Sequence, residues 1–351
     1  MKTVSRIKWM SLLAVLALVL AACGTDEGVD AETTTTVGEA TTTTADTSPE
    51  PATVRFTVFP GAIPSMGVYV ADGMGFFAEE GITLEYVTVG TGSSALQVLA
   101  AGETDFTISD LTGTASARTA GADVVFVSAQ FHRFMAELVC QPDFELPDGG
   151  YPATMEALAG ATLGITAPGS ATDTYLRYSM IAAGVDPASA EIIPIGGVPQ
   201  LLAAFDARSV ECLVAYQPMQ SLLPEHQSAV DWEAGEGPDA FDTYVFNGIV
   251  TSESFDAESP DVVRRVAAAM EKAVTFASDP NNADVIAENT VQFFEGLDQE
   301  TLAQIVRDGA GTYGYEITPE HIANAAEVYQ ATSGNELGGS YDDLIADSVA
   351  G

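Results

Sequence analysis

The arrangement of apolar and polar residues changes twice along the chain. Residues 9–20 form one apolar run, residues 24–52 show no apolar periodicity, and a regular alternation begins near residue 54. There, short apolar stretches of strand length are each followed by a helical pattern that ends at a glycine. This alternation predicts two α/β units, each with a mainly parallel sheet flanked by helices.

The expected strands fall into two groups on either side of the turn-rich residues 141–152. They cover residues 54–59, 82–89, 105–109 and 124–129 in the first group and 162–166, 191–195 and 211–216 in the second. Residues 244–250 are expected to add a strand at the edge of a sheet.

The helix signals are equally regular. One helix is expected over residues 65–80, and Ser94 with Gln97 forms a capping-box pattern that opens another. Further helix starts are expected at Ser170, Ser259-Pro260, Asp298 and Thr318-Pro319. The last dozen residues are small and acidic and are expected to fray.

Residues 1–22 predict a secretory signal. Lys2, Arg6 and Lys8 precede the apolar run, which is shorter than the ~20 residues of a membrane-spanning helix. The sequence Leu-Ala-Ala-Cys at 20–23 resembles the bacterial lipobox, and the alternative is an ordinary signal peptide with an incidental cysteine. The resemblance implies that Cys23 carries acyl chains and anchors an exported protein at the outer face of the cell membrane.

Residues 23–52 are expected to be a disordered tether. They contain two runs of four threonines, at 33–36 and 41–44, among acidic residues, glycine and proline. Without an apolar face, such a segment cannot offset the entropy of ordering. The tether is expected to let the folded body extend away from its membrane anchor.

The net charge excludes whole classes of partner. The 351 residues include 12 Lys and Arg against 50 Asp and Glu, a formal charge of −38. Without residues 1–22, which hold three of the basic groups and none of the acidic ones, the charge is −41 (9 − 50). A surface of this charge repels nucleic acid and anionic lipid, whereas the hydrophobic content of 47% indicates a folded body.

Neither the cysteines nor the known catalytic motifs point to chemistry. Cys140 and Cys212 are left to form one disulfide or to remain two buried thiols. The sequence lacks a CxxC motif, a Cys/His cluster, GxSxG, HExxH, a P-loop and a GxGxxG that opens a helix. We therefore expect no metal, no cofactor and no enzymatic activity.

The loops after the expected strands are the candidate binding site, because ligands of open α/β sheets bind beyond the carboxyl ends of strands. Several are rich in Gly, Ser and Thr, which suits a polar or anionic group at a helix start. His132 and Arg133 follow the fourth strand; they either face this site or have a structural role in the loop, Arg133 as part of an internal salt bridge. His226 and His321 are expected at the surface.

Motifs at these loops resemble one known family. Residues 71–82 closely resemble the A-x-x-x-G-F-F-x-x-E-G-[LI] signature of ABC-transporter solute-binding proteins. The relevant group takes up nitrate, sulfonates, taurine or thiamine-pyrimidine precursors (the NMT1/THI5-like group). Residues 101–106 and 158–170 match later steps of the pattern, and 209–218 match with departures, since Glu211-Cys212 replaces Asp-Ala.

The resemblance, which covers about residues 54–275, implies a bilobed periplasmic-binding-protein fold of type II with two hinge crossings and C-terminal helices. Lobe 1 would comprise residues 53–136 and 246–340, and lobe 2 residues 137–245, with hinges near 130–137 and 242–250. It further implies a monomer that delivers a small molecule to an ABC permease.

Transferred to the matching loops, the resemblance implies a set of ligand contacts. They are Ser65, Met66, Gly92, Ser93, Ser94, Asp110, Thr112, Gly169, Ser170, Thr172, Gly197, Tyr216 and Gln217, with His132 and Arg133 at the first hinge. A sulfonate or nitrate would favour the hydroxyl-rich loops and Arg133. A pyrimidine or other flat ring would favour stacking on Phe131, Phe134, Tyr175 and Tyr216.

Two other functions fit the same fold. One is a sensor whose lobes signal to a receptor. The other is an enzyme similar to the yeast-type thiamine pyrimidine synthase, which uses a Cys-rich motif and a reactive lysine. This chain has no Cys cluster, and Lys272 is its only lysine after residue 22. A small organic sulfonate or pyrimidine-type ligand for an ABC importer is the preferred interpretation.

Overall fold

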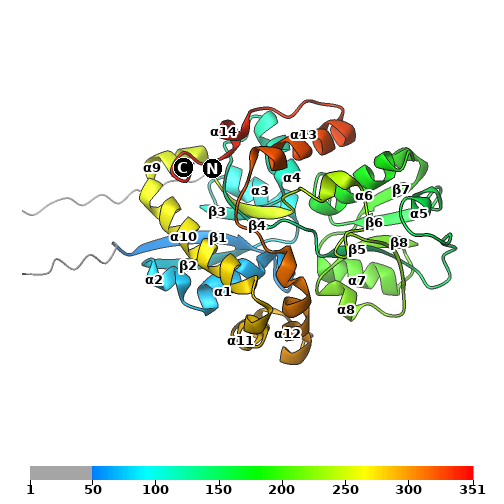
Figure 1. Ribbon diagram of the computed structural model, residues 1–351, viewed down its shortest axis with the longest axis horizontal. Helices are drawn as coiled ribbons and strands as arrows, with labels where there is room; N and C mark the ends of the chain where they lie inside the picture. The colour runs from blue at the N-terminus through cyan, green and yellow to red at the C-terminus, as the bar shows by residue number, and fades with distance from the viewer. Residues whose placement is uncertain (1–49, 351) are drawn as a thin grey trace, which may run out of the picture. The chain divides into compact units, whose positions relative to one another are not determined.

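Two five-stranded sheets flanked by helices make up residues 50–350, the part of the chain that this computed structural model describes (Figure 1). We call the sheet that contains β1, with its helices, lobe 1, and the sheet that contains β5, with its helices, lobe 2. The expected α/β class, with one sheet in each of two units, is confirmed. The predicted signal segment, Cys23 and residues 24–49 of the tether lie outside the described residues.

The sheet of lobe 1 has the order β2-β1-β3-β10-β4. Its strands are β1 (Ala52–Val58), β2 (Ile82–Thr88), β3 (Phe106–Ser109), β4 (Val125–Phe131) and β10 (Asn247–Thr251). Strand β10 is antiparallel to both of its neighbours, and the other four strands share one direction. The prediction of an edge strand at 244–250 was wrong, because β10 lies inside the sheet and is buried over its whole length.

The sheet of lobe 2 repeats this plan in the order β7-β6-β8-β5-β9. Its strands are β5 (Ala136–Cys140), β6 (Thr162–Ile165), β7 (Glu191–Pro194), β8 (Cys212–Tyr216) and β9 (Gln227–Asp231). Here β5 is the antiparallel strand, and neither β5 nor β9 was expected from the sequence. The chain therefore passes between the sheets twice, from β4 to β5 and from β9 to β10.

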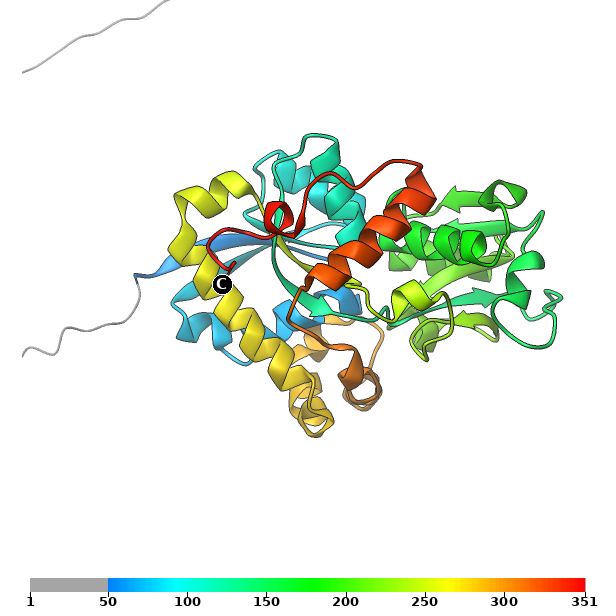
Figure 2. The same ribbon diagram turned by 45° about the horizontal axis from the view of Figure 1, so that its top comes forward.

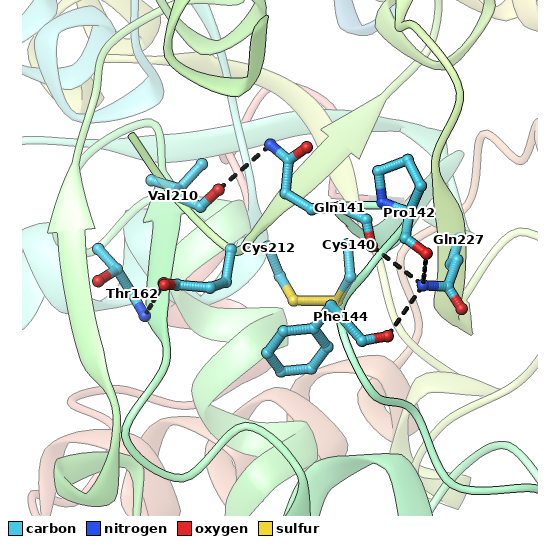
Figure 3. The surroundings of a disulfide bond; sticks show 9 residues. Cys140, Gln141, Pro142, Phe144, Thr162, Val210, Cys212 and Gln227 are labelled. Carbon is cyan, nitrogen blue, oxygen red and sulfur yellow. Dashed lines mark hydrogen bonds between the residues drawn. A yellow bond between two sulfur atoms is a disulfide. The ribbon is translucent and has the colours of Figure 1, made fainter. Parts of the chain in front are cut away.

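Cys140 and Cys212 lie directly opposite each other on β5 and β8 and form a disulfide with an S–S distance of 2.00 Å (Figure 3). Beside it, the Gln227 side-chain amide donates hydrogen bonds to three carbonyls of the segment that follows β5, those of Gln141, Pro142 and Phe144. The disulfide therefore joins the end of β5 to the start of β8, and the Gln227 amide holds the segment that follows β5.

Helices cover both sheets. Those of lobe 1 are α1 (Met66–Gly73), α2 (Phe76–Glu79), α3 (Gly92–Ala100), α4 (Leu111–Thr119), α9 (Glu253–Glu258), α10 (Pro260–Ala277), α11 (Ala283–Thr290), α12 (Gln299–Asp308) and α14 (Tyr341–Leu344). Those of lobe 2 are α5 (Ala153–Glu156), α6 (Ala171–Ala182), α7 (Val198–Asp206) and α8 (Met219–Leu222). Short 3-10 turns occur at Ile63–Ser65, Pro187–Ser189, Asp239–Phe241, Pro280–Asn282, Val291–Phe293 and Gly309–Thr312.

Two helix predictions need correction. The expected helix over 65–80 is broken into α1 and α2 at Gly75, whose φ of 80° no continuing helix adopts. The helix expected to open at Ser94 begins earlier, because Thr91 is the N-cap and Ser94 supplies the reciprocal bond of the capping box. Ser170 does precede α6, but its side chain makes no capping hydrogen bond.

The last long helix, α13 (Pro319–Ser333), contacts α4 of lobe 1 and α6 of lobe 2 (Figures 1 and 2). The Tyr178 hydroxyl of α6 donates to Glu327 at 2.7 Å, and the Asn324 side chain donates to the Thr243 carbonyl at 2.7 Å. Residues expected to belong to lobe 1 alone therefore connect the two lobes.

The expected fraying of the last dozen residues was wrong. Leu344, Ile345 and Ala346 are buried, and Ile345 pairs with Phe126 of β4. The acidic composition of this segment concealed three consecutive apolar positions. None of the helices within residues 50–350 has the length and apolar character needed to cross a membrane.

Candidate functional site

A small cavity lies where the strand ends of the two sheets face each other. The cavity has a volume of about 60 Å³, which admits a small molecule and excludes a peptide. Its lining residues come from loops after strands of both lobes and from both crossings. They are Phe59, Ala62, Pro64, Gly90, Thr91, Gly92, Ile108, Ser109, Asp110, Phe134, Thr166, Ser170, Ala171, Thr172, Tyr216, Phe246 and Asn247.

Lobe 1 contributes two capped helix starts. Thr91 closes the loop after β2 and accepts a hydrogen bond from the Ser94 backbone N–H. Asp110 follows β3, and its Oδ1 accepts the Gly113 backbone N–H at 2.7 Å as the N-cap of α4. The sequence places these residues here because a short polar side chain between strand and helix satisfies amides that have no partner inside the helix.

Lobe 2 contributes a cluster of hydroxyl groups at the start of α6. Thr166, Ser170 and Thr172 lie within 2.7–2.8 Å of one another through their side-chain oxygens. Ser170 also donates to the Ala167 carbonyl, and the Thr172 hydroxyl accepts the Thr166 backbone N–H. This wall of the cavity is polar, uncharged and largely satisfied by its own hydrogen bonds.

Aromatic rings form the remaining walls. Phe134, from the crossing that leads into β5, stacks on Phe246, from the crossing that leads back to β10, with ring centroids 4.2 Å apart. Phe59 lies after β1, and Tyr216 ends β8 with its ring buried. Burial raises the pKa of the Tyr216 phenol far above its ordinary value, so this group stays neutral.

Asp110 is the single acidic side chain among the described residues that line the cavity, and no Lys, Arg or His lines it. Burial raises the pKa of Asp110 to about 6, and hydrogen bonds from backbone amides such as that of Gly113 oppose this shift. The carboxyl group is thus mostly ionised at neutral pH although it is 6% exposed.

Contacts between the lobes close the cavity. The Ser93 hydroxyl donates to the Pro168 carbonyl at 2.9 Å, and the Ile63 backbone N–H donates to the Gln217 carbonyl at 3.1 Å. At Gly197, a Cβ would lie 3.0 Å from the Gly90 carbonyl, so only glycine permits this approach without displacement. The lobes therefore meet through backbone groups of facing loops.

The structure brings some of the predicted contact residues together at the cavity. Gly92, Asp110, Ser170, Thr172 and Tyr216 line it, and Gly197 lines an adjoining hollow that shares Tyr216. The other predicted residues support the loops. Ser65 accepts the Phe59 backbone N–H, Met66 is buried, and the Thr112 and Tyr244 hydroxyls share a hydrogen bond. The Gly169 backbone N–H donates to Asp173, Gln217 faces Glu233, and Ser93 and Ser94 make the contacts given above.

His132 and Arg133 do not lie at the main cavity. The His132 ring packs on His321 with a centroid distance of 4.7 Å and bonds the Glu316 carbonyl through Nε2. Arg133 lines a separate, smaller hollow with Trp232 and Glu236. His321, expected at the surface, is 8% exposed. The position of the first crossing in the sequence did not reveal which way these side chains turn.

Sequence reasoning also missed several lining residues. Phe246 precedes β10 and Asn247 is its first residue; a hinge was expected there, near 242–250, but no ligand contact. Asn247 Oδ1 accepts from Gln130, which also donates to the Pro64 carbonyl at 2.6 Å. Of the aromatics proposed for stacking, Phe134 and Tyr216 line the cavity, whereas Phe131 and Tyr175 pack against other rings.

Metal binding has no support in the described part of the chain. Within residues 50–350, no group of three or more His, Cys, Asp or Glu side chains is arranged to hold a metal ion.

Comparisons with known proteins agree with this geometry. A family model described as NMT1/THI5 like matches residues 63–283. The periplasmic aliphatic sulphonate-binding protein SsuA from Escherichia coli has a similar structure, with a TM-score of 0.65 and 14% identity over 86% of this chain and 99% of that one. No curated protein sequence matches the chain.

Two further solved structures share the fold. The periplasmic nitrate-binding protein NrtA from Synechocystis gives a TM-score of 0.64 with 13% identity, over 86% of this chain and 87% of that one. The ligand-binding component of an ABC-type import system from Staphylococcus aureus gives a TM-score of 0.68 with 13% identity, over 85% and 97%.

Proposed function

Because the chain belongs to the NMT1/THI5-like family, we propose that it is an extracytoplasmic solute-binding protein that captures a small molecule for an ABC permease. The observation that carries this proposal is the cavity formed by facing strand ends of both lobes. Similar structures belong to sulfonate- and nitrate-binding proteins. The proposal includes export, a lipid anchor on Cys23 and a monomeric state.

Capture requires that the lobes move relative to each other. We place the hinges at the two crossings, near residues 130–137 and 242–250, where the chain leaves one sheet for the other. The proposed boundaries remain 53–136 and 246–340 for lobe 1 and 137–245 for lobe 2, with α13 as a shared element. Bending there would part the Ser93–Pro168 contact and open the cavity.

The lining supports a pyrimidine-type compound over a sulfonate. Phe59, Phe134, Tyr216 and Phe246 offer faces for a flat ring, and the hydroxyls of lobe 2 offer polar contacts. A sulfonate needs a cationic partner or free amides, and Arg133, the one candidate partner named from the sequence, lines another hollow.

The synthase-like alternative lacks a reactive lysine at the site. Lys272 is the one lysine within residues 50–350, and its ammonium group contacts Glu79 and Glu80 at 2.9 and 2.7 Å on lobe 1. A sensor is distinguished by its partner, since it would associate with a receptor instead of a permease.

A thermal-shift screen against sulfonates, nitrate and pyrimidines tests the proposal, together with Gly92→Trp. Gly92 lines the cavity, and its Cβ position has open space around it, so the indole would block the cavity without a backbone clash. Gly311→Trp is the matched control, because Gly311 also faces open space but does not line the cavity.

We expect a pyrimidine to raise Tm in the wild type and in Gly311→Trp but not in Gly92→Trp. A shift that persists in Gly92→Trp would show that the cavity is not the capture site. If no compound raises Tm, the substrate class is wrong, and if any compound is converted to product, the binding function is wrong.

A further inference from the structure

Asp110 places a carboxylate in the cavity that no cationic side chain of the described residues pairs with. Among residues 50–350, none of the ion pairs involves this carboxylate, and neither Lys nor Arg lines the cavity. The other two buried carboxylates differ in one respect each: Asp173 pairs with Arg177, and Asp256 has no ion pair among the described residues but does not line the cavity. An unpaired charge under such burial is costly, and a complementary charge on a ligand would offset that cost.

Capping a helix does not by itself require this charge. Ser and Asn cap helices about as well as Asp. In the same chain Asp298 caps α12 in the same way, accepting the Thr301 backbone N–H at 2.7 Å, but lies at the surface where its charge is solvated. Asp110 instead lines the cavity, where its carboxylate accepts backbone N–H groups such as that of Gly113 but no side-chain donor of the described residues.

The helix starts around the cavity do not argue for an anion. Asp110 already caps the N-terminus of α4, and Thr91 caps that of α3. At α6, Asp173 accepts the Gly169 backbone N–H at 2.9 Å, and the hydroxyls bond one another. Asp173 is itself paired with Arg177, so the uncompensated charge is that of Asp110, which exceeds the partial positive charge that a helix N-terminus contributes.

The aromatic walls suit a cation as well as a flat ring. Phe59, Phe134 and Phe246 lie around the same small volume as Asp110. The faces of aromatic rings attract positive charge, most strongly where water is excluded. A carboxylate beside several rings is therefore an arrangement that binds an organic cation and rejects an anion of the same shape.

We propose that the ligand is a small, flat organic cation, of amidinium or ring-ammonium type, whose charged N–H groups bind Asp110 between the aromatic walls. This inference rests on the proposed function and narrows its ligand class. A protonated aminopyrimidine fits this class, whereas nitrate and simple sulfonates do not. Asp110 is then the residue that selects ligand charge.

Three probes of one shape test this selection: benzamidine, benzamide and benzoate, which are cationic, neutral and anionic at pH 7.5. Their affinities are measured by calorimetry for the wild type, Asp110→Asn and Asp298→Asn. Asp110→Asn retains a good N-cap and nearly the same volume. Asp298→Asn makes the same exchange at a cap away from the cavity.

We expect the wild type to bind benzamidine at least about tenfold more tightly than benzamide, with benzoate weakest. Asp110→Asn should lose most of this preference, and Asp298→Asn should keep it. The inference is overturned if benzoate binds as well as benzamidine, if Asp110→Asn keeps the preference, or if benzamidine does not bind. Anions that bind the wild type but not Gly92→Trp would overturn this inference alone and leave capture in the cavity intact.

Discussion

Lobe 1 and lobe 2 have the same strand order, but they hold the fourth strand of that order by different means. In each sheet the fourth strand is antiparallel and is the first strand after a crossing, β10 in lobe 1 and β5 in lobe 2. In lobe 2 the disulfide joins β5 to β8. In lobe 1, β10 is held by close packing, since a Cβ on Gly248 would lie 2.2 Å from the Ser128 carbonyl.

The lobes also differ in what they offer a ligand. Lobe 1 supplies the carboxylate of Asp110, and lobe 2 supplies the neutral hydroxyls of Thr166, Ser170 and Thr172. Because each fourth strand follows directly from a crossing, anything that loosens it also loosens the segment that carries Phe134 or Phe246. Strand anchoring and the shape of the cavity are therefore coupled in both lobes.

Removing the disulfide should have the largest effect. The double variant Cys140→Ala, Cys212→Ala should lose about 4 kcal/mol of unfolding free energy, since the bond spans 72 residues and restricts the unfolded chain. Urea unfolding followed by the fluorescence of Trp232, which packs in lobe 2, measures the loss.

Reduction of the wild type should reproduce this loss. An unchanged midpoint in both experiments would mean that strand packing alone secures β5, and the contrast between the lobes would disappear.

Gly248→Ala tests whether close packing holds β10 in lobe 1. The new methyl group would meet backbone atoms of β4, which cannot move aside cheaply, so we expect a loss of about 3 kcal/mol. Gly311→Ala is the control, because its methyl group would face open space. Chemical unfolding measured by circular dichroism compares the two, and equal midpoints would refute close packing as the anchor of β10.

Strand β10, which contains Gly248, shows how much of the fold could be predicted from the sequence. Apolar alternation and capping residues predicted most strands and the start of α10, and the motif resemblance pointed to the family, because these signals are local. The position of β10 could not be predicted, since its five residues suit an edge or an interior strand equally. Pairing partners lie more than a hundred residues away, and no local pattern specifies them.

The candidate site likewise contains residues that local sequence patterns predict and residues that they do not. Asp110, Ser170 and Thr172 were expected at the site because they lie between strands and helices, and they line the cavity. Arg133 lines another hollow and Phe246 was not named, because the crossings have no periodic pattern that fixes the direction of a side chain. Family motifs located the cleft, but only the folded arrangement shows which charge lines it.

Acid should destabilise α13, the helix that contacts both lobes. Burial and the nearby His132 lower the pKa of His321, in the first turn of α13, to about 4. The unfolded chain binds this proton with a pKa near 6.5. Stability should therefore be full above pH 6.5 and fall as the pH drops toward 4, by about 2 kcal/mol at pH 5.

The variant His321→Gln isolates this contribution, because glutamine can keep the capping box with Thr318 but does not titrate. Asp110, whose pKa is raised, acts with the opposite sign in an overlapping range, so the difference between wild type and variant is the quantity to measure. A difference that stays constant from pH 8 to pH 5 would contradict the linkage.

The smallest effect concerns the bond between α6 and α13. Tyr178→Phe removes the hydrogen bond to Glu327, which is exposed, so we expect a loss of only about 1 kcal/mol. Tyr151→Phe is the matched control, because its hydroxyl bonds the Ser179 carbonyl within lobe 2. Hydrogen exchange should show faster opening of α13 in Tyr178→Phe alone. If α13 exchanges equally in both variants, it is held by lobe 1 and does not connect the lobes energetically.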